Sequence, residues 1–327
     1  MSGRRVTRRT FLKAGAAVVA GGATVGVTRY ALASRPKVHI EPVASYSADL
    51  KAAILASMRQ LGVTGLFAGK RVALKPNLVE TAPVDTAINT NPAVVRAVAE
   101  VIRDLDARDV FVAEGAGHRR DSELVLDQSG LGEVLDAAGL RFCDLNVQEV
   151  QACENRGGRT RMEQLFLPLP LLQADVIVSL AKLKTHHWAG ATLSMKNFFG
   201  VMPGIVYGWP KNRLHVEGIP ESIVDIVATV RPHLGIVDGV VGMEGDGPIM
   251  GRPKSAGVLV AGTNLPALDA TCCRIMSLDP TRIDYLKLAR RNRLGPIHES
   301  AIAQTGVAIE AVRQDFGVLE HLAHIKA

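Results

Sequence analysis

The chain contains few of the residue types that mark several common functions. Phenylalanine, tryptophan and tyrosine together make up 4% of its 327 residues, which argues against a surface that stacks nucleobases. Its four cysteines form no C-x-x-C pair, so the motifs of an iron–sulfur cluster and of a zinc knuckle are both absent from the sequence. We therefore expect no iron–sulfur cluster and no nucleic-acid partner.

The cysteines allow a further expectation. Cys272 and Cys273 are adjacent within an apolar helical pattern, which favours two small thiols in a core. Cys143 and Cys153 could pair after export, and the sequence leaves that pairing open because it does not supply the geometry.

Net charge is also lacking once the first residues are set aside. Six of the 38 basic residues and none of the 32 acidic residues lie in residues 1–33. The remainder therefore carries 32 basic and 32 acidic residues, and the formal net charge of +6 belongs to the first 33 residues. The basic balance consequently gives no support for nucleic-acid binding.

Residues 1–33 have the pattern of a twin-arginine signal peptide. Arg8 and Arg9 precede Phe11 and a mild apolar run, and Ala31–Ala33 supplies the small-x-small pattern of a cleavage site. The run is short and rich in glycine against the roughly 20 apolar residues of a membrane span, although an uncleaved tether stays open. We expect a periplasmic or extracytoplasmic protein, exported folded by the twin-arginine translocation machinery, with no stable membrane span in the mature form.

Residues 34–327 favour a single α/β domain. Short Val- and Ile-rich strands alternate with amphipathic helices, as expected for a mostly parallel sheet with helices on both faces. The strands are predicted at 71–74, 110–113, near 140–143, and at 176–180, 234–237 and 257–261. Ser47 is the expected cap of the first helix, and the segment after Thr281 is expected to be mostly helical. Residues 146–172, with Pro168 and Pro170, suggest an insertion or the boundary of a second, smaller lobe.

One stretch, Lys182–Gly204 (KLKTHHWAGATLSMKNFFGVMPG), gathers cations and imidazoles directly after the predicted strand 176–180. Loops beyond the carboxyl ends of parallel strands are where ligands bind in open α/β sheets. A long connecting loop with solvated lysines is the alternative. The functional interpretation is a site for a small anionic ligand, with a histidine that moves protons near neutral pH.

Polar residues also follow three other predicted strands, so we expect a shared cleft at one edge of the sheet. Its candidate catalytic residues are Lys75, Lys184 and His186, with His186 as general acid or base. The candidate ligand-binding residues are Asn77, Glu114, Lys182, Lys196 and Asn197. In this hypothesis Lys75, Lys184 and Lys196 pair with phosphate or carboxylate oxygens.

The glycine-rich run Asp238–Gly251 (DGVVGMEGDGPIMG) supplies candidate metal ligands. Asp238, Glu244 and Asp246 are predicted to hold a divalent cation through oxygen atoms, or Asp238 orients the histidine. The run lacks the spacing of a calcium loop and of a phosphate-binding loop. A tight turn with exposed acids explains the same pattern equally well, so the cofactor stays unknown.

Seven short motifs, in order along the chain, resemble the family known as domain of unknown function 362. They are KPNL at 75–78, the Glu114-Gly115 strand end, KLKTH at 182–186, MKNFFG at 195–200, VDG at 237–239, MEGDGP at 243–248 and ALDA at 267–270. The resemblance covers about Val72–Leu294. Some members look like ferredoxin fusions and others carry twin-arginine signals; this chain is similar to the second kind. The resemblance implies that the motifs form one site, and it implies no particular reaction.

Two classes of function are compatible with these observations. One is a cell-envelope enzyme that acts on a small anionic substrate by acid–base or metal-assisted chemistry. The other is a non-catalytic metal- or ligand-binding protein of the periplasm that uses the same cleft. No Ser-His-Asp order or nucleophile elbow is apparent, which disfavours covalent acyl transfer.

Overall fold

A computed structural model describes residues 35–117 and 121–327. The predicted signal peptide lies outside these residues. Within them, nine strands share one sheet, and their bounds are β1 (Lys37–Pro42), β2 (Arg71–Pro76), β3 (Asp109–Glu114), β4 (Arg141–Asp144), β7 (Val176–His186), β8 (Gly190–Thr192), β9 (Leu234–Glu244), β10 (Arg252–Gly262) and β11 (Ala303–Gly306). Their spatial order is β11-β1-β10-β9-β7-β2-β3-β4, with β8 paired to β7.

Most of the sheet is parallel. The neighbours β9, β7, β2, β3 and β4 all run in the same direction, whereas β10 is antiparallel to both β9 and β1. The predicted mostly parallel α/β sheet is therefore confirmed. Because the five parallel strands end on one edge, residues that follow them along the chain are brought together there.

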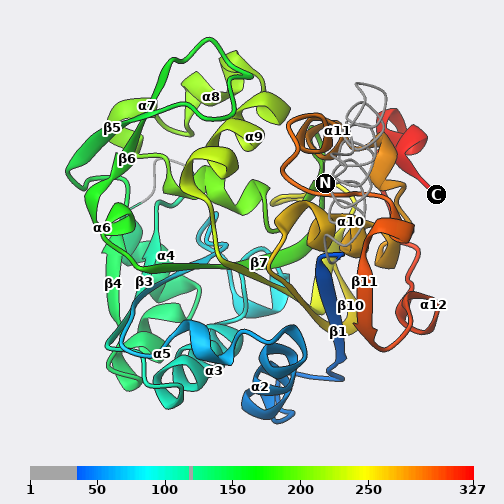
Figure 1. Cartoon of the computed structure of the whole chain (residues 1–327), viewed down its shortest axis with the longest axis horizontal. Helices are drawn as coiled ribbons and strands as arrows, with labels where there is room; N and C mark the ends of the chain where they lie inside the picture. Colours follow the sequence, from blue (N-terminus) through cyan, green and yellow to red (C-terminus); the bar gives the residue numbers. More distant parts are fainter. Residues whose placement is uncertain (1–34, 118–120) are drawn as a thin grey trace, which may run out of the picture. The chain divides into compact units, whose positions relative to one another are not determined.

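Helices cover both faces of this sheet (Figure 1). One face carries α2 (Leu50–Leu61), α3 (Pro92–Asp104), α4 (Ser122–Gln128) and α5 (Leu131–Ala137). The other carries α9 (Ile219–Val230), α10 (Leu265–Ile275) and α11 (Asp284–Arg291). Each face has its own hydrophobic core, because alternate residues of every strand point to opposite sides. Cys272 and Cys273 are buried thiols of α10.

The helices begin where side chains satisfy free backbone N–H groups. Asn91 Oδ1 accepts a hydrogen bond from Ala93 N at 2.9 Å, and Pro92 occupies the first turn of α3. Asp49 Oδ1 caps α2 through Ala52 N at 3.0 Å. The expected cap, Ser47, instead contacts the Ser45 hydroxyl, because the helix begins three residues after Ser47, too far for the hydroxyl to reach its first N–H groups.

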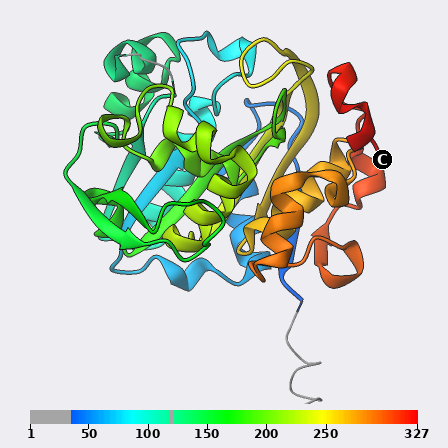
Figure 2. The ribbon, with the colours of Figure 1, turned by 90° about the horizontal axis from the view of Figure 1, so that it is seen from above.

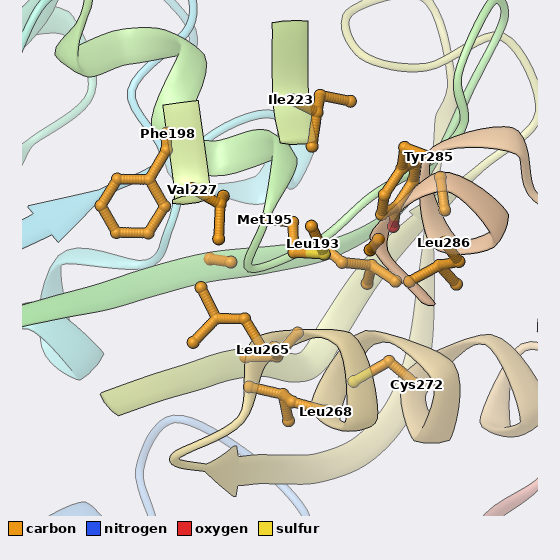
Figure 3. Packing of buried hydrophobic residues seen from close by; sticks show 14 of the residues in the cluster. Leu193, Met195, Phe198, Ile223, Val227, Leu265, Leu268, Cys272, Tyr285 and Leu286 are labelled. Atoms are coloured by element: carbon orange, nitrogen blue, oxygen red, sulfur yellow. The ribbon is translucent and has the colours of Figure 1, made fainter. Parts of the chain in front are cut away.

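The segment after β8 is part of the core. Figure 3 shows Leu193, Met195 and Phe198 packed among side chains of α9, α10 and α11, including Val227 and Leu268. This burial holds the start of the 3₁₀ helix Lys196–Val201 (η3) firmly against the sheet.

Two strands continue well beyond their predicted carboxyl ends. The predicted strand 176–180 continues to His186, and 234–237 continues to Glu244. Lys182, Lys184 and Asp238 therefore lie inside buried strands instead of in loops. The predicted strands end at their first charged residues, because charged side chains are usually exposed. In the structure, hydrogen bonds and ion pairs allow these charged side chains to be buried.

Residues 146–172 contain a separate antiparallel pair, β5 (Val150–Glu154) and β6 (Gln164–Pro168), followed by α6 (Leu169–Leu172). The pair lies beside α7 (Gly204–Tyr207) and α8 (Asn212–Glu217) in Figure 1. Tyr207 Oη accepts a hydrogen bond from Phe166 N at 2.8 Å, so the pair is tied to the main body.

The segment after Thr281 is less helical than predicted. It holds α11, the four-residue α12 (Ile309–Val312), two short 3₁₀ helices, β11 and irregular chain. Figure 2 shows these C-terminal parts gathered along one side. Across the two described ranges, no helix combines the length and the apolar character that crossing a bilayer requires.

Candidate functional site

A cavity of about 370 Å³ opens beyond the carboxyl ends of β2, β3 and β7. Segments far apart in the sequence form its wall: residues 77–79, 114–117, 186–188, 192–200, 210–215 and 246–250 contribute. Six of the predicted site residues line it, namely Asn77, Glu114, His186, Lys196, Asn197 and Asp246. Five others do not, namely Lys75, Lys182, Lys184, Asp238 and Glu244.

Lys75 and Glu114 form a buried ion pair at the cavity wall. Lys75 Nζ also donates hydrogen bonds to Pro76 O at 2.8 Å and to Asn197 Oδ1 at 3.1 Å. Burial lowers the pKa of Lys75 and raises the pKa of Glu114, and the charge of each partner opposes that shift. The donors of Lys75 are all used within the protein, so we assign it a structural role in place of the predicted catalytic one.

The carboxylate of Glu114 joins several segments. It accepts hydrogen bonds from Leu78 N at 3.1 Å and from Gly115 N at 2.8 Å, besides the ammonium of Lys75. The segment η3 approaches this pair closely at Gly200, where a Cβ atom would overlap Glu114 Oε1 and lie 2.8 Å from Lys75 Nζ. The ion pair therefore fixes where η3 lies.

His186, at the end of β7, presents a defined tautomer. Its Nδ1 accepts hydrogen bonds from Trp188 N at 3.0 Å and from Ala189 N at 3.2 Å, so the proton of the neutral ring is on Nε2. Burial lowers the pKa of His186 well below its usual value, and the nearby cation of Lys196 lowers it further. The ring is thus a neutral hydrogen-bond donor, and this geometry argues against the predicted role as general acid or base.

Lys196 is a cation of the cavity that forms no ion pair among the described residues. Its Nζ lies 4.2 Å from the centre of the Phe199 ring, a cation–π contact, and no carboxylate pairs with it within residues 35–117 and 121–327. Burial lowers the pKa of Lys196 to about 8, with a further contribution from the charge of Lys75. Its amine is therefore available to a ligand and titrates close to physiological pH.

Lys211 adds a second cation from the segment before α8. It is buried, and its Nζ donates to the amide oxygen of Asn146. Burial lowers the pKa of Lys211 to about 8. Neither Lys196 nor Lys211 forms an ion pair among the described residues, although the charges of Glu114 and Asp144 raise the pKa of Lys211 against the effect of burial.

Two buried acceptors of the wall are also unused. Asn77 Oδ1 and Thr192 Oγ1 have no hydrogen-bond partner among the described residues, and both residues line the cavity. Buried polar atoms are normally paired. The wall therefore has hydrogen-bonding capacity beyond its cations.

Asp269 of α10 supports the strand end from which η3 begins. Its carboxylate accepts hydrogen bonds from Ser194 N at 2.8 Å, Met195 N at 3.0 Å and Tyr285 Oη at 3.2 Å, and from the Ser194 hydroxyl. Burial raises the pKa of Asp269 to about 7, although these donors oppose the shift. Asp269 thereby positions the residue immediately before Lys196 without lining the cavity.

Lys182 and Asp238 lie outside the cavity because they pair with each other. They are neighbours in the register of β7 and β9, with Lys182 Nζ 2.8 Å from Asp238 Oδ2. Tyr46 Oη lies within hydrogen-bond distance of both, and Asp238 Oδ2 accepts from Asn91 N at 3.1 Å. This buried group anchors the start of α3, so the geometry replaces the predicted ligand and metal roles with a structural one.

Lys184 is also fully buried away from the cavity. Its Nζ donates to Ile88 O at 2.6 Å and to Pro248 O at 3.3 Å. Burial lowers the pKa of Lys184 well below its usual value, and the charge of Lys182 lowers it further. The predicted catalytic lysine thus joins two loops, one of which carries the cavity residues Pro248 and Met250.

The predicted metal ligands are not assembled. Glu244 pairs with Arg252 at 2.7 Å and Lys254 at 2.9 Å; burial raises its pKa, but hydrogen bonds from Gly317 N and these cations lower it to about 2. Asp246 lies 3.3 Å from His187 Nδ1. Among the described residues, no three His, Cys, Asp or Glu side chains are placed to hold a metal ion.

Several cavity residues were not among the candidates, including Trp188, Phe199, Lys211 and His215. Trp188 and Phe199 lie within the stretch Lys182–Gly204, of which only lysines, His186 and Asn197 were named as candidates. Lys211 and His215 follow a Gly-Trp-Pro turn without any strand pattern, so only the tertiary fold shows that they reach the site.

Comparisons with known proteins agree with these motifs. Residues 72–274 match the family model described as Domain of unknown function (DUF362). A thylakoid-associated protein of Synechocystis sp. is 32% identical over 266 residues, which are 77% of this chain and 78% of that protein. The chain therefore belongs to the DUF362 family.

Solved structures give partial matches. The lactate racemase apoprotein from Thermoanaerobacterium thermosaccharolyticum superposes with a TM-score of 0.42 at 11% identity. The match covers 75% of this chain and 57% of that chain.

Proposed function

We propose that the cavity binds a small organic anion and that the protein is an enzyme in which Lys196 transfers a proton to or from that anion. The observation that carries the proposal is the Lys196 amine, which faces the cavity without a carboxylate partner among the described residues. We further propose that the twin-arginine pattern of residues 1–33 directs this activity to the cell envelope.

The charges of the described wall favour an anion. Lys75 is paired with Glu114, and His187 faces Asp246, whereas neither Lys196 nor Lys211 forms an ion pair with a carboxylate among the described residues. The neutral Nε2–H of His186 is a third donor, and it retains this role because Nδ1 is occupied by backbone N–H groups. Three donors in a partly enclosed site suit a carboxylate or a phosphate monoester.

The lowered pKa of Lys196 suits proton transfer. With a pKa of about 8, about a quarter of the amine is neutral at pH 7.5, against about 0.1% for an ordinary lysine with a pKa of about 10.4. A general base works best when its pKa lies near the working pH. The neutral amine accepts a proton from a bound acid, and the ammonium returns one.

Binding is tested by isothermal titration with butanoate and with butyl phosphate at pH 7. Lys196→Met should weaken the affinity for the preferred anion about tenfold or more, since a charge-assisted hydrogen bond contributes about 1.5–3 kcal/mol. Lys287→Met, which removes an exposed lysine of α11 paired with Asp284, is the matched control and should bind like the natural protein. Equal affinities for both variants would refute the site.

The alternative class, a non-catalytic binding protein, is distinguished by Lys196→Arg. Arginine keeps the positive charge but does not lose its proton near neutral pH. Purified protein is incubated in D₂O with a panel of hydroxy, oxo and unsaturated acids, and loss of C–H signals is followed by proton NMR. An enzyme loses exchange in Lys196→Arg while anion binding remains. Absence of exchange for every acid, together with intact binding, favours the binding protein.

A further inference from the structure

The cavity has an apolar wall that runs outward from Lys196. The ammonium of Lys196 contacts the Phe199 ring, the Phe199 and His215 ring centres are 6.0 Å apart, and those of His215 and Trp188 are 5.9 Å apart. This series of rings joins the cation to the opening. In a chain with two tryptophans and 4% aromatic residues, such a concentration along one wall indicates a contact surface.

The opening itself exposes large apolar side chains. Trp188 is 66% exposed and Met250 is 77% exposed, and both line the cavity. Their loops are adjacent, because His187 N donates to Gly247 O at 2.9 Å. Val216, beside His215, is 75% exposed. Contiguous exposed apolar residues of this kind mark binding surfaces more often than scattered ones do.

We infer that the anion is amphiphilic, with its charged group at Lys196 and Lys211 and an apolar chain that follows the ring wall past Trp188 and Met250. This inference rests on the proposed anion site. A volume of about 370 Å³ lies at the lower end of the range for small-molecule pockets, which suits a medium-length chain that leaves through the opening. The ring wall continues into the cavity, so it favours a tail of the ligand over a partner protein docked outside.

The test compares octanoate with butanoate by isothermal titration. Transfer of one methylene from water to an apolar site corresponds to about a fourfold change in affinity, so half-buried methylenes give about twofold each and four of them about sixteenfold. We expect octanoate to bind the natural protein at least about tenfold more tightly than butanoate. The ratio of the two dissociation constants should fall towards one in Trp188→Ala and in Met250→Ala.

Leu172→Ala is the control, since Leu172 is an exposed apolar residue of α6 outside the cavity, and it should keep the natural ratio. A measurement on the natural protein guards against variants that fold poorly: 8-bromooctanoate should quench tryptophan emission at concentrations that follow its dissociation constant. Both results support the inference.

The outcomes separate the two proposals. Equal affinity for butanoate and octanoate overturns the amphiphilic ligand and leaves anion binding intact, in which case the exposed rim belongs to a protein or membrane contact. A chain-length effect that survives in the Trp188→Ala/Met250→Ala double variant overturns the assigned path. If butanoate, octanoate and their phosphate analogues all fail to bind, the proposed anion site is itself refuted.

Discussion

The buried ion pair of Lys75 and Glu114 gives a quantitative prediction for stability. In Glu114→Gln the ammonium of Lys75 loses its carboxylate partner and keeps only neutral oxygens, such as Pro76 O and Asn197 Oδ1, as neighbours. Breaking a buried pair by removal of one partner costs about 3–5 kcal/mol, because an unpaired charge remains. With about 2.1 cal/mol/K of unfolding entropy per residue over about 290 residues, we expect the melting temperature to fall by about 5–8 °C.

The companion variants sharpen this prediction. Lys75→Met should cost a similar amount, but the double variant Lys75→Met/Glu114→Gln should cost clearly less than the sum, since no unpaired charge remains. Thermal unfolding by circular dichroism and calorimetry measures all three. Lys287→Met, at an exposed pair, should shift the melting temperature by less than about 1 °C.

The pH dependence has opposite signs in the two single variants. Without Glu114, the folded-state pKa of Lys75 lies below its unfolded value, so the deficit of Glu114→Gln should shrink as pH rises from 7 to 9. Without Lys75, the folded-state pKa of Glu114 lies above its unfolded value, so the deficit of Lys75→Met should shrink as pH falls from 8 to 6. Strictly additive costs, or deficits that do not change with pH, would refute the assignment of a buried, charged pair.

Three more predictions follow from the site and from the first residues. The affinity for butanoate should fall as pH rises from 7 to 9, because a group with a pKa of about 8 goes from about 91% to about 9% protonated. Titration calorimetry should show about a tenfold loss of affinity for each lysine that contacts the anion, and a smaller loss in Lys196→Met. An affinity that does not change with pH would contradict the assignment. Asp269→Asn should destabilise the fold by about 2–4 kcal/mol and weaken anion binding, because an amide cannot accept hydrogen bonds from all four donors. Tyr285→Phe removes one donor and should cost less free energy of unfolding in the same assay. Equal costs for the two variants would count against this reasoning. Replacement of Arg8 and Arg9 by lysine should retain the protein in the cytoplasm, as cell fractionation would show, and normal delivery of the variant to the envelope would disprove the signal.

The parallel sheet was predictable because its strands are short runs of Val, Ile and Leu. Strands that are buried on both faces have such continuous apolar sequences. The end of β7 was not predictable. Lys182 and Lys184 look like the start of a loop. Only the tertiary structure brings Asp238 to pair with Lys182, and two carbonyl groups to accept hydrogen bonds from Lys184. Local pattern therefore locates a buried strand but misplaces its boundary when charges are paired inside it.

Six of the predicted site residues line the cavity, but the contacts of each one could not be predicted from the sequence. His186 and Lys196 were identified because they follow a buried strand, and both line the cavity. The role of His186 depends on two backbone N–H groups that occupy Nδ1, a feature of the turn and not of residue type. Glu244 and Asp246 are two residues apart, but the cations of β10 hold Glu244, so spacing alone does not predict a metal site.

The close approach at Gly200 restricts how this site can change by mutation. Any side chain at position 200 would have to displace either the Glu114 carboxylate or the segment that carries Lys196. A substitution there would therefore disturb stability and ligand affinity at once. Saturation mutagenesis should find position 200 intolerant of every residue but glycine, while the exposed opening at Trp188 and Met250 is free to vary. Such an arrangement lets ligand preference diverge at the rim while the charged interior of the cavity stays the same.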